Sequence, residues 1–516
     1  MDKITPFDIP LLNYEICQYL SQQDLTCCVQ VSKAWAAWFA PTLWRDLDYQ
    51  KTLPDAYTLA RQQEHVKILR NIAMKSVGPV LAQLPCMNLQ RLDFMENECY
   101  LDIRPVQLQV LSVLEKISTL RHLQITLALD SDSACQQWIR VLEANPHLES
   151  LSLKSVQFVD GMVFQKILQL CSGYERLSFC LMRKETITEG PRANESNTHE
   201  INEQGYRDAK AAIERMPEMR VRELSFHSYL ELCQDTILYP LLERCPRMEK
   251  LDLPWVDRVS TLQYLSKASK EQKLPKLRHL VMGGLFTVNF LEDLIKAVSC
   301  IKSMESLQFH HGLLKTAAFS QCLVQYHHHS LTRLDFGRAV LTLWMFSVAM
   351  AGLPNLQYAK AKTYVEKEDG TDVVPLDKRW KCLDLRCLLL TMETWSSGLV
   401  LGSIQWAAST QKQSMDYLFP EIAKMKNLQE LKLGCGQKDL YLLKSGYLTQ
   451  LADLKQMRVF DLATTPRKRF GKQEGSWMAK HWPRLVRVYS HGASAYFRRG
   501  VLEKRPHVEI LEQPAC

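Results

Sequence analysis

The chain has 516 residues, of which 46% are hydrophobic and 23% charged, and it carries a formal net charge of +8. This composition is typical of a folded chain and excludes an intrinsically disordered one, while the length allows several compact domains or one elongated repeat array. Residues 464–516 hold eleven Lys or Arg against four Glu, so most of the excess positive charge belongs to the C-terminal region.

The first residues, Met1-Asp2-Lys3, lead directly into polar and helical sequence without the apolar run of a secretion signal. The sixteen cysteines form no regular framework, so we expect reduced thiols and a cytoplasmic or nuclear location. The apolar run 339–353 is too short to span a bilayer, and the run 388–408 contains Glu393 among Ser, Thr and Gln. Both runs predict buried helices, and we expect no membrane association.

Residues 8–44 carry apolar side chains at helical spacing, and the stretch from Ser21 to Asp24 supplies capping residues between two helical patterns. Pro10 suits the first turn of a helix. Three short helices in so few residues cannot easily bury all of this apolar surface themselves. Such a module is usually stabilised by docking against another surface.

The same stretch resembles the F-box over its whole length. The matching residues are Ile9-Pro10, Glu15-Ile16, Leu20-Ser21, Asp24-Leu25, Val31-Ser32, Trp35 and Leu43-Trp44. One departure is Leu11-Leu12-Asn13, where many members carry Pro-Glu. The resemblance implies docking on a Skp-type adaptor of a cullin–RING ubiquitin ligase, and the alternative is an ordinary helical cap. The implied adaptor-binding residues are Ile9, Pro10, Leu12, Ile16, Leu20, Leu25, Val31, Trp35, Leu43 and Trp44.

A second pattern follows, in which an apolar residue, two polar residues, Leu, one variable residue and another apolar residue recur together. Most steps between successive copies are 24 to 31 residues, which is close to the period of leucine-rich repeats. This period predicts one short parallel strand and one helix per repeat, with neighbours stacking to bury the Leu positions. Copies begin at Leu89, Leu120, Leu148, Tyr174, Val221, Met248, Leu277, Met304, Leu331, Trp380, Leu428 and Met457, with weaker ones near Leu356 and Leu485.

The series resembles leucine-rich repeats of the irregular kind found in fungal F-box substrate receptors. The resemblance implies an α/β fold in which a curved parallel sheet carries its helices on the convex side. The expected domains are an F-box at 1–50, a helical linker or cap at 51–83, the solenoid at 84–490 and a basic cap or tail at 491–516. Two long steps predict insertions at about 183–215 and 386–426.

In each predicted strand, the residues on either side of the buried Leu point to the opposite face, and stacking aligns them in columns on the concave surface. Neighbours such as Arg91 and Asp93 could simply neutralise each other in solvent, at ~1 kcal/mol or less per exposed pair. We interpret the mixed polar face as a whole as a surface that recognises a protein. The candidate substrate-binding residues are Arg91, Asp93, His122, Arg176, Lys250, Asp252, His279, Arg333, Asp335 and Asp384.

No catalytic motif is found, whether a phosphate-binding loop, a nucleophile-elbow serine or a zinc-binding His-Glu-x-x-His, so we expect neither enzymatic activity nor a cofactor. His310, His311, Cys322 and the run 327–329 suggest a metal at first sight. Adjacent histidines on a helix point in different directions, however, and no ligand pair has zinc-finger spacing. We expect no metal site.

The basic C-terminal region offers a second hypothesis. Its cations are interleaved with aromatic residues, which is the pattern used to bind single-stranded nucleic acid or a phosphorylated ligand. The alternative, which we favour, is a terminal repeat cap with aromatic residues in its core. The residues are Arg467, Lys468, Arg469, Lys472, Arg498, Arg499, Lys504 and Arg505, with Phe470, Trp477, Trp482, Tyr489, Tyr496 and Phe497.

The expected function is therefore that of the substrate-recognition subunit of a Skp–cullin–F-box ubiquitin ligase. It would bind the adaptor through the F-box and a protein substrate, which the sequence does not identify, through the repeats. The alternative is a non-enzymatic scaffold that binds nucleic acid or a phosphorylated ligand through the basic C-terminal region.

Overall fold

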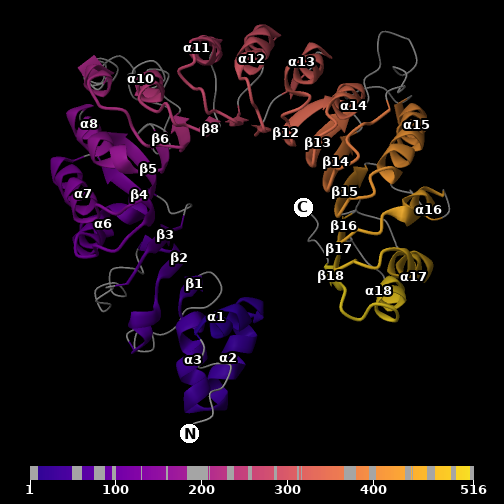
Figure 1. Cartoon of the computed structure of the whole chain (residues 1–516), viewed down its shortest axis with the longest axis horizontal. Helices are drawn as coiled ribbons and strands as arrows, with labels where there is room; N and C mark the ends of the chain where they lie inside the picture. The colour runs from indigo at the N-terminus through magenta and orange to yellow at the C-terminus, as the bar shows by residue number, and fades with distance from the viewer. Residues whose placement is uncertain are drawn as a thin grey trace. The chain divides into compact units, whose positions relative to one another are not determined.

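The computed structural model divides the chain into two compact units, Met1–Met248 and Glu249–Cys516, and each is described by itself. Figure 1 shows the elements of both units. The described residues are 10–48, 61–74, 88–95, 100–129, 131–158, 161–182, 207–208, 210–228, 237–253, 259–283, 288–310, 313–314, 317–364, 379–393, 403–435, 443, 446–461, 471–489 and 495–511.

The first unit begins with the three expected helices, α1 (Pro10–Tyr19), α2 (Gln22–Val31) and α3 (Lys33–Leu43). The buried side chains of Cys17, Leu25 and Phe39 form the core of this helical module. The predicted capping residues form a capping box, in which the Ser21 hydroxyl accepts from the Asp24 N–H and the Asp24 carboxylate accepts from the Ser21 N–H. The N-terminal capping signal in the sequence is therefore confirmed.

Seven strands of the first unit pair in parallel, in the order in which they occur along the chain. Helices separate most neighbouring strands. The strands are β1 (Asp46–Asp48), β2 (Ile68–Ile72), β3 (Arg91–Phe94), β4 (His122–Leu129), β5 (Ser150–Phe158), β6 (Arg176–Met182) and β7 (Glu223–Ser228). The helical segments are η2 (Gln63–His65), α6 (Tyr100–Leu114), α7 (Asp132–Ala144), α8 (Gly161–Leu170), η3 (Cys171–Gly173) and α10 (Tyr239–Glu243).

The strands of the second unit also pair in parallel. The short strand β11 pairs with β12, as β10 does. The strands are β8 (Lys250–Leu253), β9 (His279–Met282), β10 (Ser306–Phe309), β11 (Leu313–Leu314), β12 (Arg333–Thr342), β13 (Tyr358–Tyr364), β14 (Cys387–Glu393), β15 (Glu430–Cys435), β16 (Val459–Asp461), β17 (Arg487–Tyr489) and β18 (Glu509–Leu511). The helical segments are α11 (Val259–Lys270), α12 (Val288–Cys300), α13 (Ala317–His327), α14 (Leu343–Gly352), α15 (Ser403–Ala423), α16 (Tyr447–Gln450), η6 (Leu451–Asp453), α17 (Lys472–His481) and α18 (Ala495–Leu502).

The strands form because the central Leu of each motif meets the same Leu in the next repeat. Leu92 pairs in register with Leu123, and Leu307 pairs with Leu334. All four side chains are buried. Within each unit the helices of the repeats, from α6 onward, lie on the outer side of the strands (Figure 1). The predicted α/β leucine-rich-repeat fold, with its parallel sheet and outer helices, is confirmed.

Several boundaries differ from the sequence-based expectation. The parallel sheet begins at Asp46, because β1 and β2 lie in segments that we assigned to the F-box and to a helical linker. The expected insertion at 386–426 contains β14 and α15, so it is itself a repeat. The expected tail at 491–516 contains α18 and β18, which form a further repeat. Most of the predicted insertion at 183–215 lies outside the described residues.

The two apolar runs are only partly helical. Residues 339–342 belong to β12, and the helix α14 follows them. The run 388–408 begins in β14, and its residues from Ser403 onward belong to α15, which corrects the expectation of one buried helix. Among the described residues, no helix has both the length and the apolar content that a membrane crossing needs.

Candidate functional site

The strand face, which we define as the side chains at the first and third positions of the repeat strands, faces away from the helices. In the first unit, Arg91, His122 and Arg176 occupy the same register position of β3, β4 and β6. Arg91 Nε donates to Asp93 Oδ2 at 2.8 Å. Burial, and then the nearby Arg176, lower the pKa of His122, which favours the neutral ring near pH 7. The first-unit candidates therefore share one face, as the sequence predicted.

In the second unit, the first candidates lie beside groups that the sequence did not select. Lys250 and His279 are register partners in β8 and β9. The His279 ring lies 4.0 Å from Glu305, and the His310 ring lies 3.6 Å from Asp252. These pairs are partly exposed, and each is worth ~1 kcal/mol or less. This part of the strand face is polar and largely paired.

One cluster of contacts on the strand face is centred on Asp335, whose side chain is only 4% exposed. Its carboxylate accepts from the Gly337 N–H at 2.7 Å and from the Tyr358 hydroxyl at 3.4 Å. Arg333 and Lys360 lie within 3.7 and 3.5 Å of the same carboxylate. We expected Asp335 to be an exposed ligand-binding residue; instead it is buried and holds its neighbours in place.

The Arg333 guanidinium stacks over the Tyr358 ring, with its carbon 3.8 Å from the ring centroid. Burial, and then Asp335, raise the pKa of Tyr358, so its hydroxyl stays protonated as a donor. A fixed arginine on an aromatic ring offers a partner a flat surface with unused N–H groups at its edge. The sequence missed Tyr358, because its repeat was visible only as a degenerate copy near Leu356.

The next strands continue this surface with residues that the sequence did not select. Cys387 and Leu389 of β14 lie in register with Tyr358 and Lys360 of β13. Burial, and then Glu430, raise the pKa of Cys387 to about 12, so it is a protonated thiol that packs as an apolar group. Lys432 forms a 2.7 Å ion pair with Asp461. The result is a half-buried apolar strip bordered by charged pairs.

Asp384 does not belong to the strand face. It precedes β14 and accepts a 2.9 Å hydrogen bond from the Asn427 side chain. The motif fitted to Trp380-Lys-Cys-Leu383 was five residues early, because the repeat starts at Leu385 and Leu383 is 52% exposed. The register pairing of Tyr358 with Cys387 shows that strand β14 begins at Cys387.

The predicted adaptor-binding residues differ in how exposed their side chains are. Leu12 and Val31 are exposed, whereas Leu25 is buried and belongs to the core of the helical module. Tyr19 is the most exposed large hydrophobic side chain among the described residues. Pro10 opens α1, and Ile9 lies outside the described residues. The remaining ones, Ile16, Leu20, Trp35, Leu43 and Trp44, are half-buried.

The sequence did not select Tyr14 and Tyr19, although both are exposed on α1. Tyr19 lies seven positions after Leu12, which places both side chains on the same side of the helix. Tyr14 lies on another side, where Arg45 approaches its ring to 5.9 Å. Helical spacing from Leu12 would have found Tyr19 if tyrosine had been counted as apolar.

The C-terminal region buries two of its five described aromatic residues and exposes Tyr496. Trp482 and Phe497 are fully buried, and Trp477 stacks on His481 with ring centroids 4.3 Å apart. Lys472 and Arg499 both form ion pairs with Glu503. These positions support the terminal-cap interpretation. Residues 467–470, which carry part of the basic pattern, lie outside the described residues.

The histidine-rich segment forms no metal site in the part of the chain that the structure describes. His327 is buried, and its Nε2 lies 2.9 Å from the Val298 carbonyl oxygen. Burial lowers the pKa of His327, so its ring is a neutral group of the repeat core.

Comparison with known proteins shows distant structural similarities, and two of them are given below. No family model matches the chain, and no curated protein matches its sequence. The crystal structure of the Rad7 and Elc1 complex in yeast is 12% identical, covers 96% of this chain and 98% of that chain, and has a TM-score of 0.39. The crystal structure of a Bacteroides fragilis protein is 13% identical, and the match covers 61% of this chain and 72% of that chain. Its TM-score is 0.26. At these TM-scores, neither similarity supports an argument about function.

Proposed function

We propose that the chain is the substrate-recognition subunit of a Skp–cullin–F-box type of ubiquitin ligase. The helical module of residues 10–44 would bind the adaptor, and the strand face of the repeats would bind a protein substrate. The chain would act in the cytoplasm or nucleus by holding a substrate lysine near the ubiquitin-transfer machinery of its partners. This role requires no catalytic residue and no cofactor of its own.

The observation that carries this proposal is the apolar surface of the helical module. Leu12, Tyr19 and Val31 are 44, 85 and 63% exposed. Large apolar side chains exposed on so small a module suit a protein-docking surface. The F-box resemblance of the same helices names the class of partner, a Skp-type adaptor.

The core of the module explains how these side chains are presented. Cys17, Leu25 and Phe39 pack together, and Trp35 lies on Phe39 with ring centroids 5.4 Å apart. These contacts fix the three helices, so that Leu12 and Tyr19 stay on the surface. The half-buried Ile16 packs against this core as well.

The substrate side of the proposal is supported by the stacked Arg333 and Tyr358 beside Leu389. Arginine and tyrosine are enriched among the residues that dominate binding energy in protein interfaces. Asp335 holds both of them through contacts of 3.7 and 3.4 Å, so little side-chain freedom is lost on binding. A rigid, partly apolar surface of this kind suits a folded protein or an extended peptide.

The test is a pull-down of the purified chain with a Skp-type adaptor. The variant Leu12→Asp/Tyr19→Asp places two charges on the exposed side of α1 and should weaken adaptor binding by roughly ten-fold or more. Since both side chains are exposed, the module should still fold, which circular dichroism checks.

The chain offers a matched control for this variant. Tyr496 and Leu502 of α18 are also exposed, at 69 and 39%, and Tyr496→Asp/Leu502→Asp makes the same chemical change in the second unit. This control should bind the adaptor like the parent. If the parent fails to bind, or if both variants bind as it does, the proposed adaptor role is wrong.

A further inference from the structure

The last strand of the second unit, β18, ends the repeat array with an open edge. It pairs in parallel with β17, and no strand in the described part of the chain pairs with its other edge. In the register of the array, Ile510 follows Phe460 and Val488, which are both fully buried. Ile510 itself is only half-buried. The position that each repeat buries against the next one is therefore partly uncovered where the array ends.

The first strand of the array shows the same position in a covered form. Leu47 of β1 pairs in register with Leu69, and its side chain is 3% exposed. β1 follows directly after the helical module in the same unit. The first repeat strand thus buries its core residue, whereas the last one does not.

The backbone of β18 offers hydrogen-bonding groups on the open edge. The Glu509 N–H donates to the Val486 carbonyl oxygen at 2.8 Å, on the side of β17. Successive residues of a strand direct their N–H and C=O groups to opposite edges, so those of Ile510 point away from β17. An edge of this kind can pair with a strand from another protein.

The protection that sheet edges commonly carry is weak here. Proteins often block an edge strand with a charged side chain, a proline or a bulge. The three residues of β18 include one charged side chain, Glu509. Its carboxylate accepts from Nε and Nη2 of Arg487, each at 2.9 Å, so its charge is neutralised within the sheet.

The helix of the last repeat adds an apolar side chain at the same end. Gly500 packs against α17, since a Cβ there would meet the Lys472 carbonyl oxygen. Leu502 lies two residues later, about 200° around the helix, so it is turned away from α17. Leu502 and Leu511 are both 39% exposed. The end of the array therefore presents an open strand edge together with uncovered apolar side chains.

The charge around this end indicates which kind of partner it fits. Glu503, the other carboxylate among residues 495–511, lies 3.0 Å from Lys472 and is paired as well. Lys504 and Arg505 lie in the turn before β18 and form no ion pair within the residues that the structure describes. This positive end favours a partner with carboxylates. A second copy of the chain would bring the same cations together, which is unfavourable.

We propose that β18 binds an extended, acidic segment of a partner protein, which adds a strand to the open edge. The backbone of the segment would pair with Ile510, and its apolar side chains would cover Ile510 and Leu502. Its carboxylates would lie near Lys504 and Arg505. This surface is separate from the strand face and from the helical module, so the proposal goes beyond the proposed function and does not depend on it.

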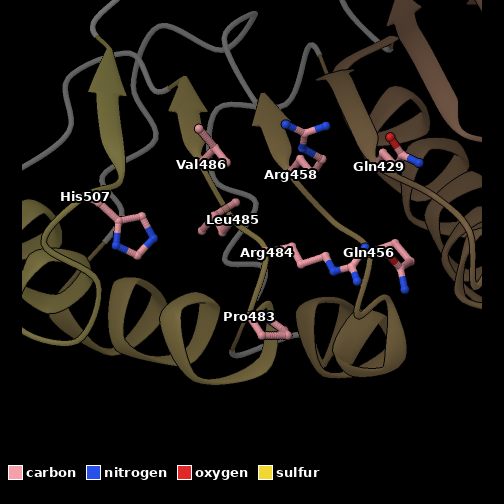
Figure 2. Close-up of a pocket in the computed structure, with 8 residues that line it drawn as sticks. All are labelled: Gln429, Gln456, Arg458, Pro483, Arg484, Leu485, Val486 and His507. Atoms are coloured by element: carbon pink, nitrogen blue, oxygen red, sulfur yellow. Dashed lines mark hydrogen bonds between the residues drawn. The ribbon is translucent and has the colours of Figure 1, made fainter. Parts of the chain in front are cut away.

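A hollow of about 370 Å³ lies beside the turns that lead into the last strands, but it does not form a comparable site (Figure 2). Arg484 and Gln456 extend toward each other, and Arg484 Nη1 donates to Gln456 Oε1 at 2.5 Å. Arg458 extends away from both of them (Figure 2), so the arginines do not converge on one ligand. The lining residues are Gln429, Gln456, Arg458, Pro483, Arg484, Leu485, Val486 and His507.

The test measures binding of fluorescent peptides to the full chain by anisotropy at low ionic strength. The acidic probe has a Val-Thr-Val centre with two glutamates at each end, so that carboxylates reach the turn before β18 in either strand direction. One comparison peptide has lysines in place of the glutamates, and another carries N-methyl groups on the three central residues. The acidic probe should bind roughly ten-fold or more tightly than either, because one comparison peptide reverses the charge and the other lacks the N–H donors of a strand.

Variants of the chain locate the binding site. Ile510→Pro removes the N–H on the open edge, while the hydrogen bonds to β17 do not use that group. It should weaken binding of the acidic probe by roughly ten-fold or more. Ile510→Val keeps the N–H and is the matched control, which should bind within roughly two-fold of the parent. Circular dichroism checks that both variants fold.

A second pair of variants does not alter the strand. Lys504→Glu reverses an exposed charge beside β18 and should weaken binding of the acidic probe by roughly three-fold or more. Lys480→Glu makes the same change at an exposed position of α17 and should change binding by less than roughly two-fold. Equal losses in these two variants would mean nonspecific attraction and would overturn the proposal.

Hydrogen exchange followed by mass spectrometry gives a direct readout of strand addition. The acidic probe should slow exchange in the fragment that contains Ile510 and leave the strands β8 to β10 unchanged. No binding by the parent, or equal binding of the acidic and N-methylated peptides, would contradict the proposal. So would a dimer, seen by sedimentation velocity, that Ile510→Pro dissociates, because a second copy would then cover the edge.

The adaptor pull-down separates this proposal from the proposed function. Ile510→Pro should bind the adaptor normally, because β18 lies outside the helical module. Leu12→Asp/Tyr19→Asp should bind the acidic probe normally. A parent that binds the acidic probe but not the adaptor would contradict the proposed function alone.

Discussion

The helical module and the repeats use the same residue types in opposite ways. In the repeats, leucines such as Leu307 are fully buried, because the neighbouring repeat supplies the covering surface. In the module, Leu12 and Tyr19 are exposed, because three short helices have too small a core to cover them. A periodic apolar pattern therefore predicts burial only where the next element repeats it. Where the pattern stops, the uncovered side chains are available to a partner.

The largest expected difference in the free energy of unfolding is between two leucine-to-alanine variants, one in each region. Leu307→Ala should lower the free energy of unfolding by about 2–5 kcal/mol, because it removes buried methyl groups and leaves a cavity between neighbouring repeats. Leu12→Ala should change it by only about 0.5 kcal/mol or less, because the side chain is already largely in water. Urea unfolding followed by circular dichroism measures both values. Similar losses in the two variants would mean that Leu12 belongs to a folded core.

A second test concerns the backbone that supports the strand face. Gly337 has φ of +55° and lies at a bulge in β12, where a Cβ would overlap the Phe309 carbonyl oxygen. Gly337→Ala should cost about 1–3 kcal/mol of stability, since neither the backbone oxygen nor the left-handed conformation accommodates a side chain. Gly173→Ala is the control, because a Cβ there meets open space. Thermal unfolding of both variants should show a loss only for Gly337→Ala.

A third test uses the charged group that holds the start of a repeat. Glu421 is 1% exposed and accepts from Lys424 Nζ at 2.7 Å, from Arg379 Nη1 at 3.0 Å and from the Trp380 N–H at 2.9 Å. Burial alone would raise the pKa of Glu421, but these hydrogen bonds together hold it below its usual range. Glu421→Gln should cost about 1–3 kcal/mol at neutral pH.

The pH dependence of that cost has a defined sign. Because the pKa of Glu421 is lowered in the folded state, its stabilising effect is fully present above the ordinary glutamate pKa of about 4.3. The effect is then lost as the pH falls from there through the lower folded value. The parent and Glu421→Gln should therefore converge in urea midpoint at acidic pH. A difference that stays constant through this range would contradict the assigned contacts.

Sequence reasoning located most repeats because the repeat period and the buried Leu positions determine the fold. Strands β3 to β10 begin two residues after the predicted motif starts, for example at Arg91 after Leu89. The error at Trp380 arose because Trp380, Leu383 and Leu385 fit the motif by residue type. Only the structure shows that they differ in burial: the Trp380 N–H donates to Glu421, and Leu383 is exposed.

The candidate surfaces were predictable in outline but not in detail. Within the first unit, the alternation along each strand correctly placed Arg91 and His122 on one face. It could not show that Asp335 is buried, because that depends on the bulge at Gly337 and on contacts from a repeat too degenerate to recognise.

The smallest expected effect concerns the cap that begins α2. Ser21→Ala removes the acceptor for the Asp24 N–H, at 3.2 Å, and should cost about 1 kcal/mol. Since the module has a core of only a few side chains, this loss should appear as faster amide hydrogen exchange in α2. Exchange in the strands of the repeats should not change, because each repeat is stabilised by its own neighbours.

The equivalent cap of α7, where Ser131 accepts from Ala134, gives the control Ser131→Ala, which should increase exchange in α7 and leave α2 unchanged. If Ser21→Ala increased exchange throughout the repeats, the helical module and the repeats would be a single cooperative unit, and the contrast between a self-covering array and a module that needs a partner would fail.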